Sequence, residues 1–150
     1  MLVGGFGSQL HGAHRQTFDI DLVPSTAASN EQRLADALKE LDARLRVAGM
    51  TDDEARQLSV VIDAATIRAF GSTTWMTDAG PLDVLTELPV AGGRRTFADL
   101  EQRTTDVEFS GVIVRIASLD GIIDSKSHAD RPKDRDALPE LRKLRADRPD

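Results

Sequence analysis

The sequence has no cysteine and no long apolar run, and each absence excludes a class of protein. Without cysteine there are no disulfides, no thiolate zinc sites and no cysteine nucleophile. No apolar run approaches the roughly 20 residues of a transmembrane helix. No basic segment precedes Met1-Leu2-Val3, so no signal peptide is predicted. We interpret the chain as a cytoplasmic protein without a membrane partner.

Positive charge is also scarce. The net charge is −6 and the isoelectric point is near 5.0, which argues against a general polynucleotide binder, because such a domain is expected to be basic. The charge is uneven, however, and the tail is rich in cations: Arg131, Lys133, Arg135, Arg142, Lys143, Arg145 and Arg148. A local contact with phosphate or RNA is therefore retained as a hypothesis for the tail.

Length and composition are those of one globular domain. The chain has 150 residues, of which 40% are hydrophobic and 29% charged, so it can bury a core of its own. We expect residues 1–150 to form a single domain.

Strand and helix patterns alternate along the chain. The predicted strands are 1–3, 18–23 (ended by Pro24), a hairpin of 72–76 with 82–88, and a hairpin of 107–109 with 112–117 around Ser110-Gly111. The predicted helices are 8–12, 96–104, 118–128 and 132–146, the last kinked or divided at Pro139. This mixture predicts an α+β fold with a small mixed sheet flanked by helices and a C-terminal helical segment.

A longer amphipathic helix is predicted from Ser29 to about Gly49. Ser29 and Gln32 have the spacing of a capping box. Four leucines follow at helical spacing: Leu34, Leu38, Leu41 and Leu45. The segment 51–70 is less regular, with a helix start at 52–54 and a strand at 58–62.

Two aspartates in the second strand are the first candidates for chemistry. Asp19 and Asp21 are two residues apart, so in a strand their side chains point to the same face. Magnesium prefers hard oxygen ligands and usually takes one or two carboxylates together with substrate phosphates. Asp83 is a third candidate, since it lies within an apolar strand, where a carboxylate is costly unless it is paired or bound to a metal. The alternative is that these strands lie at an edge and expose the acids to solvent.

Glycines precede this strand. Gly4 and Gly5 follow the first strand directly, and their N–H groups, with Ser8, are candidates to bind phosphate. The run is neither a G-x-G-x-x-G motif nor a P-loop. A tight turn between strand and helix explains the glycines equally well.

A basic cluster near the C-terminus completes the set. It includes Lys126, Arg131, Lys133 and Asp134. Lysine commonly contacts triphosphates in phosphoryl transfer. An exposed, charged helix end is the alternative.

Together these motifs resemble the nucleotidyltransferases of the DNA polymerase β-like superfamily. That signature is an apolar residue, G-[GS], a spacer, and D-h-[DE]-h, where h is apolar. Here it is Val3-Gly4-Gly5, thirteen residues, and Asp19-Ile20-Asp21-Leu22. The third acid of the family matches Asp83. Family members usually carry an N-terminal helix before the glycines, and this sequence shows none.

The C-terminal motif is similar to that of minimal nucleotidyltransferases of the AbiEii toxin type. The resemblance implies a magnesium-dependent (or manganese-dependent) transfer of a nucleoside monophosphate from a triphosphate to an acceptor hydroxyl. It implies that Asp19, Asp21 and Asp83 are catalytic and bind metal.

It also implies that Gly4, Gly5, Ser8, Lys126 and Asp134 bind the nucleotide. The acceptor stays open between a tRNA end or protein, with an antitoxin partner, and a small molecule such as an aminoglycoside. A non-catalytic nucleotide-binding module is the remaining alternative.

Overall fold

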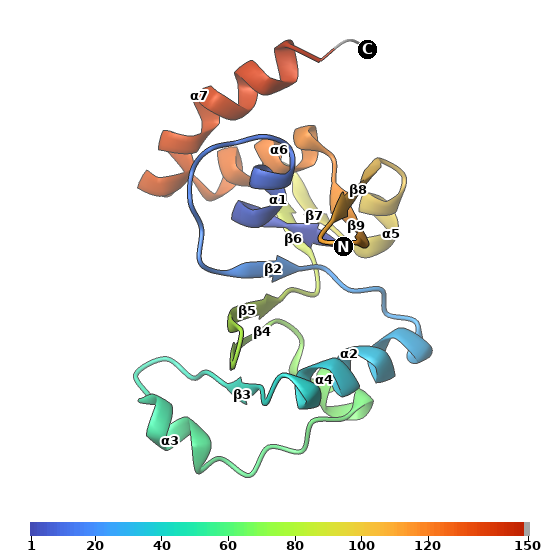
Figure 1. The fold of residues 1–150 in the computed structure, drawn as a ribbon, viewed down its shortest axis with the longest axis vertical. Helices are drawn as coiled ribbons and strands as arrows, with labels where there is room; N and C mark the ends of the chain where they lie inside the picture. The colour runs from blue at the N-terminus through green and yellow to red at the C-terminus, as the bar shows by residue number, and fades with distance from the viewer. Residues whose placement is uncertain (149–150) are drawn as a thin grey trace.

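The protein folds around a seven-stranded mixed sheet (Figure 1). A computed structural model shows this fold and describes residues 1–148, apart from the side chain of Asp52. The strands, in their order across the sheet, are β3 (Arg44–Leu45), β4 (Thr73–Thr77), β5 (Gly80–Val84), β2 (Ile20–Leu22), β1 (Leu2–Val3), β9 (Val112–Ala117) and β8 (Thr104–Phe109). The pairs β1–β9 and β2–β5 are parallel, and the other neighbours are antiparallel. The predicted α+β architecture is confirmed.

Helices lie on both sides of this sheet. They are α1 (Gly4–Leu10), α2 (Ala28–Glu40), α3 (Asp52–Arg56), α4 (Ala64–Phe70), α5 (Phe97–Glu101), α6 (Leu119–Ala129) and α7 (Pro132–Ala146). In Figure 1, α1, α6 and α7 lie at one end of the molecule and α2, α3 and α4 at the other. A separate two-stranded sheet joins β6 (Leu88–Val90) to β7 (Gly93–Arg95). Within residues 1–148, no helix combines the length and the apolar character needed to span a membrane.

Two hydrophobic cores hold these layers together. One joins β1 to α6 and α7 through Val3, Ile122 and Leu141. The other joins α2 to β4 and β5 around Leu38 and Trp75. Trp75 is 1% exposed and lies at the centre of this second core. The sheet is thus anchored separately on each side of its central strands.

Both predicted hairpins are present. In β8–β9 the chain turns at Ser110 and Gly111, whose φ angles of 51° and 79° suit a two-residue turn of the hairpin type. The β4–β5 hairpin pairs Thr73 with Val84 and Thr77 with Gly80. Periodicity and turn residues were therefore sufficient to locate both pairs of strands.

Two helix boundaries differ from the prediction. The first helix begins at Gly4, directly after β1, and not at Ser8. The second begins at Ala28 without a side-chain cap, so the predicted capping box at Ser29 is wrong. It ends at Glu40, because Asp42 adopts a φ of 47° and the chain then enters β3.

The segment 51–70 also differs. The helix start at 52–54 is confirmed by α3, but 58–62 forms no strand. Helix α4 follows and was not predicted. The residue in the sequence that could have indicated the start of α4 is Asp63. Its carboxylate accepts a 2.7 Å hydrogen bond from the Thr66 N–H and caps the helix.

The remaining differences concern where elements end. The strand predicted over 82–88 stops at Val84, and Leu88 begins β6. The helix predicted over 96–104 ends at Glu101. The last helix is continuous through Pro139 and is not divided.

Truncation of a core leucine tests how firmly α7 is held. Leu141 is fully buried. We expect Leu141→Ala to lower the free energy of unfolding by about 2–5 kcal/mol, through lost burial and the cavity that remains. Leu58→Ala is the matched control, because Leu58 is 37% exposed. Urea denaturation followed by Trp75 fluorescence measures both, and equal effects of the two substitutions would contradict this account of the core.

Candidate metal and nucleotide site

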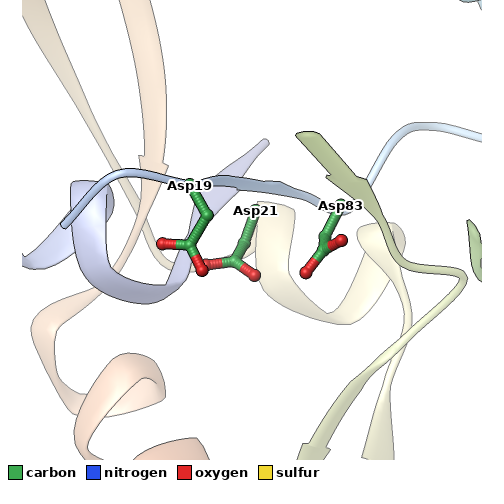
Figure 2. Close-up of side chains that lie close together, drawn as sticks. All are labelled: Asp19, Asp21 and Asp83. Carbon is green, nitrogen blue, oxygen red and sulfur yellow. The ribbon is translucent and has the colours of Figure 1, made fainter. Parts of the chain in front are cut away.

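Three carboxylates converge on one face of the sheet (Figure 2). Asp21 on β2 lies directly opposite Asp83 on β5 in the parallel register, and Asp19 immediately precedes β2. One oxygen of each carboxylate lies within 4.8 Å of the others. The expected convergence is present, and it joins residues more than sixty positions apart in the sequence.

The electrostatics of this cluster favour a bound cation. Burial raises the pKa of Asp21, and so do the charges of Asp19 and Asp83. Asp83 Oδ1 is buried, and within residues 1–148 it has no hydrogen-bond partner. A divalent cation would relieve the repulsion and satisfy this oxygen, and all three ligands are the hard oxygen donors that magnesium and manganese take. The residues therefore fit such an ion.

The two glycines allow the backbone to pass close to these acids. Gly4 has a φ of +62°, and a Cβ at this position would lie 1.8 Å from Asp21 Oδ2. At Gly5 a Cβ would lie 2.6 Å from Thr17 Oγ1. The Gly5 N–H donates a hydrogen bond to Asp21. The glycines thus bring the start of α1 against the carboxylates.

The other site residue predicted on α1 is turned inward. Ser8 is 6% exposed, and its hydroxyl donates a 2.9 Å hydrogen bond to the Gly4 carbonyl. Thr17, which sequence reasoning did not select, donates a hydrogen bond from its hydroxyl to Asp19 Oδ1. Its position ahead of the D-x-D strand was the only signal for it.

A buried carboxylate organises the basic cluster. Asp134 is 0% exposed, and it accepts hydrogen bonds from Lys126 Nζ at 3.3 Å and Arg131 Nε at 2.6 Å. Burial alone would raise the pKa of Asp134, but the Arg131 hydrogen bond and the Lys126 charge outweigh it and hold the pKa below the usual value. Asp134 therefore holds the side chains of Lys126 and Arg131 in place.

A cleft of about 720 Å³ joins these parts. Its acidic lining residues are Asp19, Asp21, Asp83 and Glu140, and its basic ones are Arg15, Arg46, Lys126, Arg131 and Lys133. Gly4, Gly5 and Ser8 line it too. Asp134 does not, although the sequence grouped it with nucleotide-binding residues. Arg15, Phe18, Arg46 and Thr74 line the cleft without belonging to any motif.

Comparison with known proteins gives a likeness in fold. No family model matches the chain, and no curated protein matches it. Among solved structures, the chain is similar to the crystal structure of the lincosamide antibiotic adenylyltransferase LnuA with lincomycin bound. The TM-score is 0.56 and the identity 15%, over 95% of this chain and 85% of that one. The protein therefore has a nucleotidyltransferase-like fold, as the sequence predicted.

Substitution of Gly4 tests the close approach to Asp21. Gly49 is a matched control, because its φ is +82° but nothing lies within 4 Å of an added Cβ. We expect Gly49→Ala to cost about 1–2 kcal/mol of backbone strain. Gly4→Ala should cost more and abolish stabilisation by Mg²⁺, since the methyl group displaces Asp21. Chemical denaturation with and without Mg²⁺ measures both, and equal costs would contradict the clash.

Neutralisation of Asp21 tests the repulsion. Because the pKa of Asp21 is raised in the folded state, its ionisation lowers the free energy of unfolding as the pH rises through that pKa. Without divalent cations, Asp21→Asn should therefore raise Tm at neutral pH. The difference should vanish below about pH 3.9, the ordinary pKa of aspartate, where the carboxyl is protonated in both states.

Mg²⁺ should reverse this ranking at neutral pH. At ten times its Kd it should stabilise the natural protein by about 1.4 kcal/mol, with no comparable gain for Asp21→Asn. Asp53→Asn is the control, because Asp53 is exposed and lies outside the cleft. A thermal melt at each pH would contradict the account if Mg²⁺ stabilised the natural protein and Asp21→Asn equally.

Proposed function

We propose that the chain is a single-domain nucleotidyltransferase that uses Mg²⁺ or Mn²⁺ and transfers a nucleoside monophosphate from a triphosphate to an acceptor hydroxyl. The convergence of Asp19, Asp21 and Asp83 is the observation that carries this proposal, together with a buried Asp83 oxygen that has no hydrogen-bond partner among the described residues. The similarity of the fold to an antibiotic adenylyltransferase supports it.

The reaction is an in-line displacement at the α-phosphorus. The acceptor oxygen forms a bond to phosphorus, the bond to the bridging oxygen of the β-phosphate breaks, and pyrophosphate leaves with that electron pair. Asp83 takes the proton of the acceptor hydroxyl. Asp19, Asp21 and Asp83 would hold the metal, which would supply positive charge for the phosphates when bound.

The triphosphate binds between α1 and the basic cluster. Gly4, Gly5 and Ser8 line the cleft together with Lys126 and Arg131. Because Asp134 is buried beneath these two cations, its part in nucleotide binding is to hold their side chains in place. Both cations then remain fixed before the phosphates arrive, which reduces the entropy cost of binding.

The acceptor divides the proposal into two versions. In the toxin-like version, which follows the resemblance to AbiEii-type proteins, the acceptor is a tRNA end or a protein and an antitoxin is the partner. In the other version the acceptor is a small molecule, and the similar structure was solved with lincomycin bound. Five basic and four acidic side chains line the cleft. A bound triphosphate would cancel this small excess of positive charge together with that of the metal, so the charge of the cleft does not decide between the two acceptors.

Transfer of label tests the proposal. Each α-labelled triphosphate is incubated with the protein and, separately, total tRNA, a cell lysate, an aminoglycoside or a lincosamide. We expect one pool to become labelled. Asp19→Asn with Asp21→Asn should reduce the rate on the order of 1,000-fold or more, because charge stabilisation of the transition state is lost.

Asp53→Asn is the matched control and should retain activity. Equal labelling by the natural protein and the Asp19/Asp21 variant would refute catalysis by this cluster. If no pool became labelled while magnesium-dependent triphosphate binding persisted, the non-catalytic alternative would replace it.

A further inference from the structure

The row of paired residues across the sheet that contains Asp21 and Asp83 continues onto β4. Asp21 pairs with Asp83, and Asp83 pairs with Thr74 on β4. Paired residues on neighbouring strands present their side chains to the same face of a sheet. The Arg46 N–H then donates a 2.8 Å hydrogen bond to the Thr74 carbonyl. The row therefore leads from the carboxylates to Thr74 and Arg46 at the β3 edge, and all four residues line the cleft.

Arg46 places an exposed positive charge at this end of the cleft. Among the side chains that the structure describes, which leave out that of Asp52, its guanidinium has no hydrogen bond or ion pair. Arg131 and Arg15, by contrast, are paired with Asp134 and Asp136. An exposed guanidinium in a cleft is available to bind an anionic group such as phosphate.

Phe18 exposes an aromatic ring in the same cleft. Phe18 is 85% exposed, immediately precedes Asp19 and lines the same cleft. Its carbonyl lies 3.9 Å from where a Cβ on Gly80 would be, which places this part of the backbone near the β4–β5 turn. A ring so exposed contributes little to the core, but it offers a flat face to a planar ligand.

This end of the cleft lies across the acids from the basic cluster. In the strand order, β5, β4 and β3 lie on one side of β2, and β1, which leads into α1, lies on the other. Helix α1 packs on α6, which carries Lys126. In an in-line displacement, the attacking and leaving oxygens lie on opposite sides of the phosphorus. If pyrophosphate leaves toward Lys126, the acceptor approaches from Thr74 and Arg46.

We propose that Phe18 and Arg46 form an acceptor subsite for the single-stranded end of an RNA. An unpaired nucleobase stacks on Phe18, and an adjacent phosphate binds Arg46. This inference rests on the proposed function, because it names the substrate class of the same site. The base of the bound triphosphate would offer the same flat ring, so the test must separate these two sources.

Binding without turnover makes the test independent of catalysis. The probes are a fluorescent single-stranded RNA of about 12 nucleotides, a length typical of single-strand sites, the same RNA as a duplex, and a non-hydrolysable triphosphate. The variants are Phe18→Ala, Phe18→Trp and Arg46→Ala. The controls are Phe70→Ala and Arg33→Ala, which alter an exposed ring and an exposed charge outside the cleft.

We expect Phe18→Ala to weaken binding of the single strand about 5- to 150-fold, as loss of one base stack does. Phe18→Trp should retain the affinity. Arg46→Ala should reduce the slope of log K against log salt by about 0.7, the value for one phosphate contact to a single strand. The duplex should bind more weakly, and triphosphate affinity should be unchanged in all variants.

Other outcomes overturn the subsite. Equal RNA affinity in Phe18→Ala and Phe70→Ala would exclude the stack, and an unchanged salt slope in Arg46→Ala would exclude the phosphate contact. Weaker triphosphate binding with unchanged RNA binding would assign the ring to the nucleotide. Labelling of a protein without RNA binding would replace RNA by a protein acceptor.

The subsite and the proposed function can fail separately. If RNA binding depends on Phe18 but no acceptor becomes labelled, the proposed function fails while the subsite stands. Unchanged Trp75 fluorescence shows that the fold is intact in the variants that add no tryptophan, since Trp75 is fully buried. For Phe18→Trp, which adds a second tryptophan, an unchanged circular dichroism spectrum shows the same.

Discussion

The approach of the Gly4 backbone to the Asp21 side chain is the constraint on which the site depends. Val3 pairs with Asp21 across β1 and β2, and the chain enters α1 at the next residue. Only glycine fits there, because a Cβ would overlap the carboxylate and the φ is positive. The same turn delivers the Gly5 N–H to Asp21. One contact thus sets the path of α1 and the position of a central acid.

Around that contact, the three aspartates and the main cluster of cations come from different elements of the fold. The acids project from the sheet, whereas Lys126, Arg131 and Lys133 come from α6 and from the segment around the start of α7. Asp134 lies buried between two of these cations and is held ionised by them. The acids have no such partner for Asp83 Oδ1 within residues 1–148. This imbalance is the physical basis for the proposed binding of a cation at the aspartates and of phosphate at the basic cluster.

Local patterns in the sequence predicted much of the fold. The β8–β9 turn, the Ser118 cap of α6 and the D-x-D strand each depend on residues within a few positions of one another. Prediction failed where neighbours in space overrode local preference. Leu45 continues the helical spacing of the leucines, yet it lies in β3 and pairs with Trp75 of β4. Residues 58–62 are rich in β-branched side chains, but no strand forms there because no strand of the sheet pairs with them.

The sequence by itself determined the chemical inventory of the site: two acids on one strand face, a third acid in an apolar strand, glycines after the first strand, and a basic tail. These are properties of residue type and spacing, which the chain carries before it folds. Only the tertiary structure decided which of them meet. The parallel pairing of β2 with β5 brings Asp83 to Asp21, the packing of α7 buries Asp134, and the β3 edge adds Arg46 to the cleft. Contacts between residues so far apart arise from packing of the whole chain, so no local pattern records them.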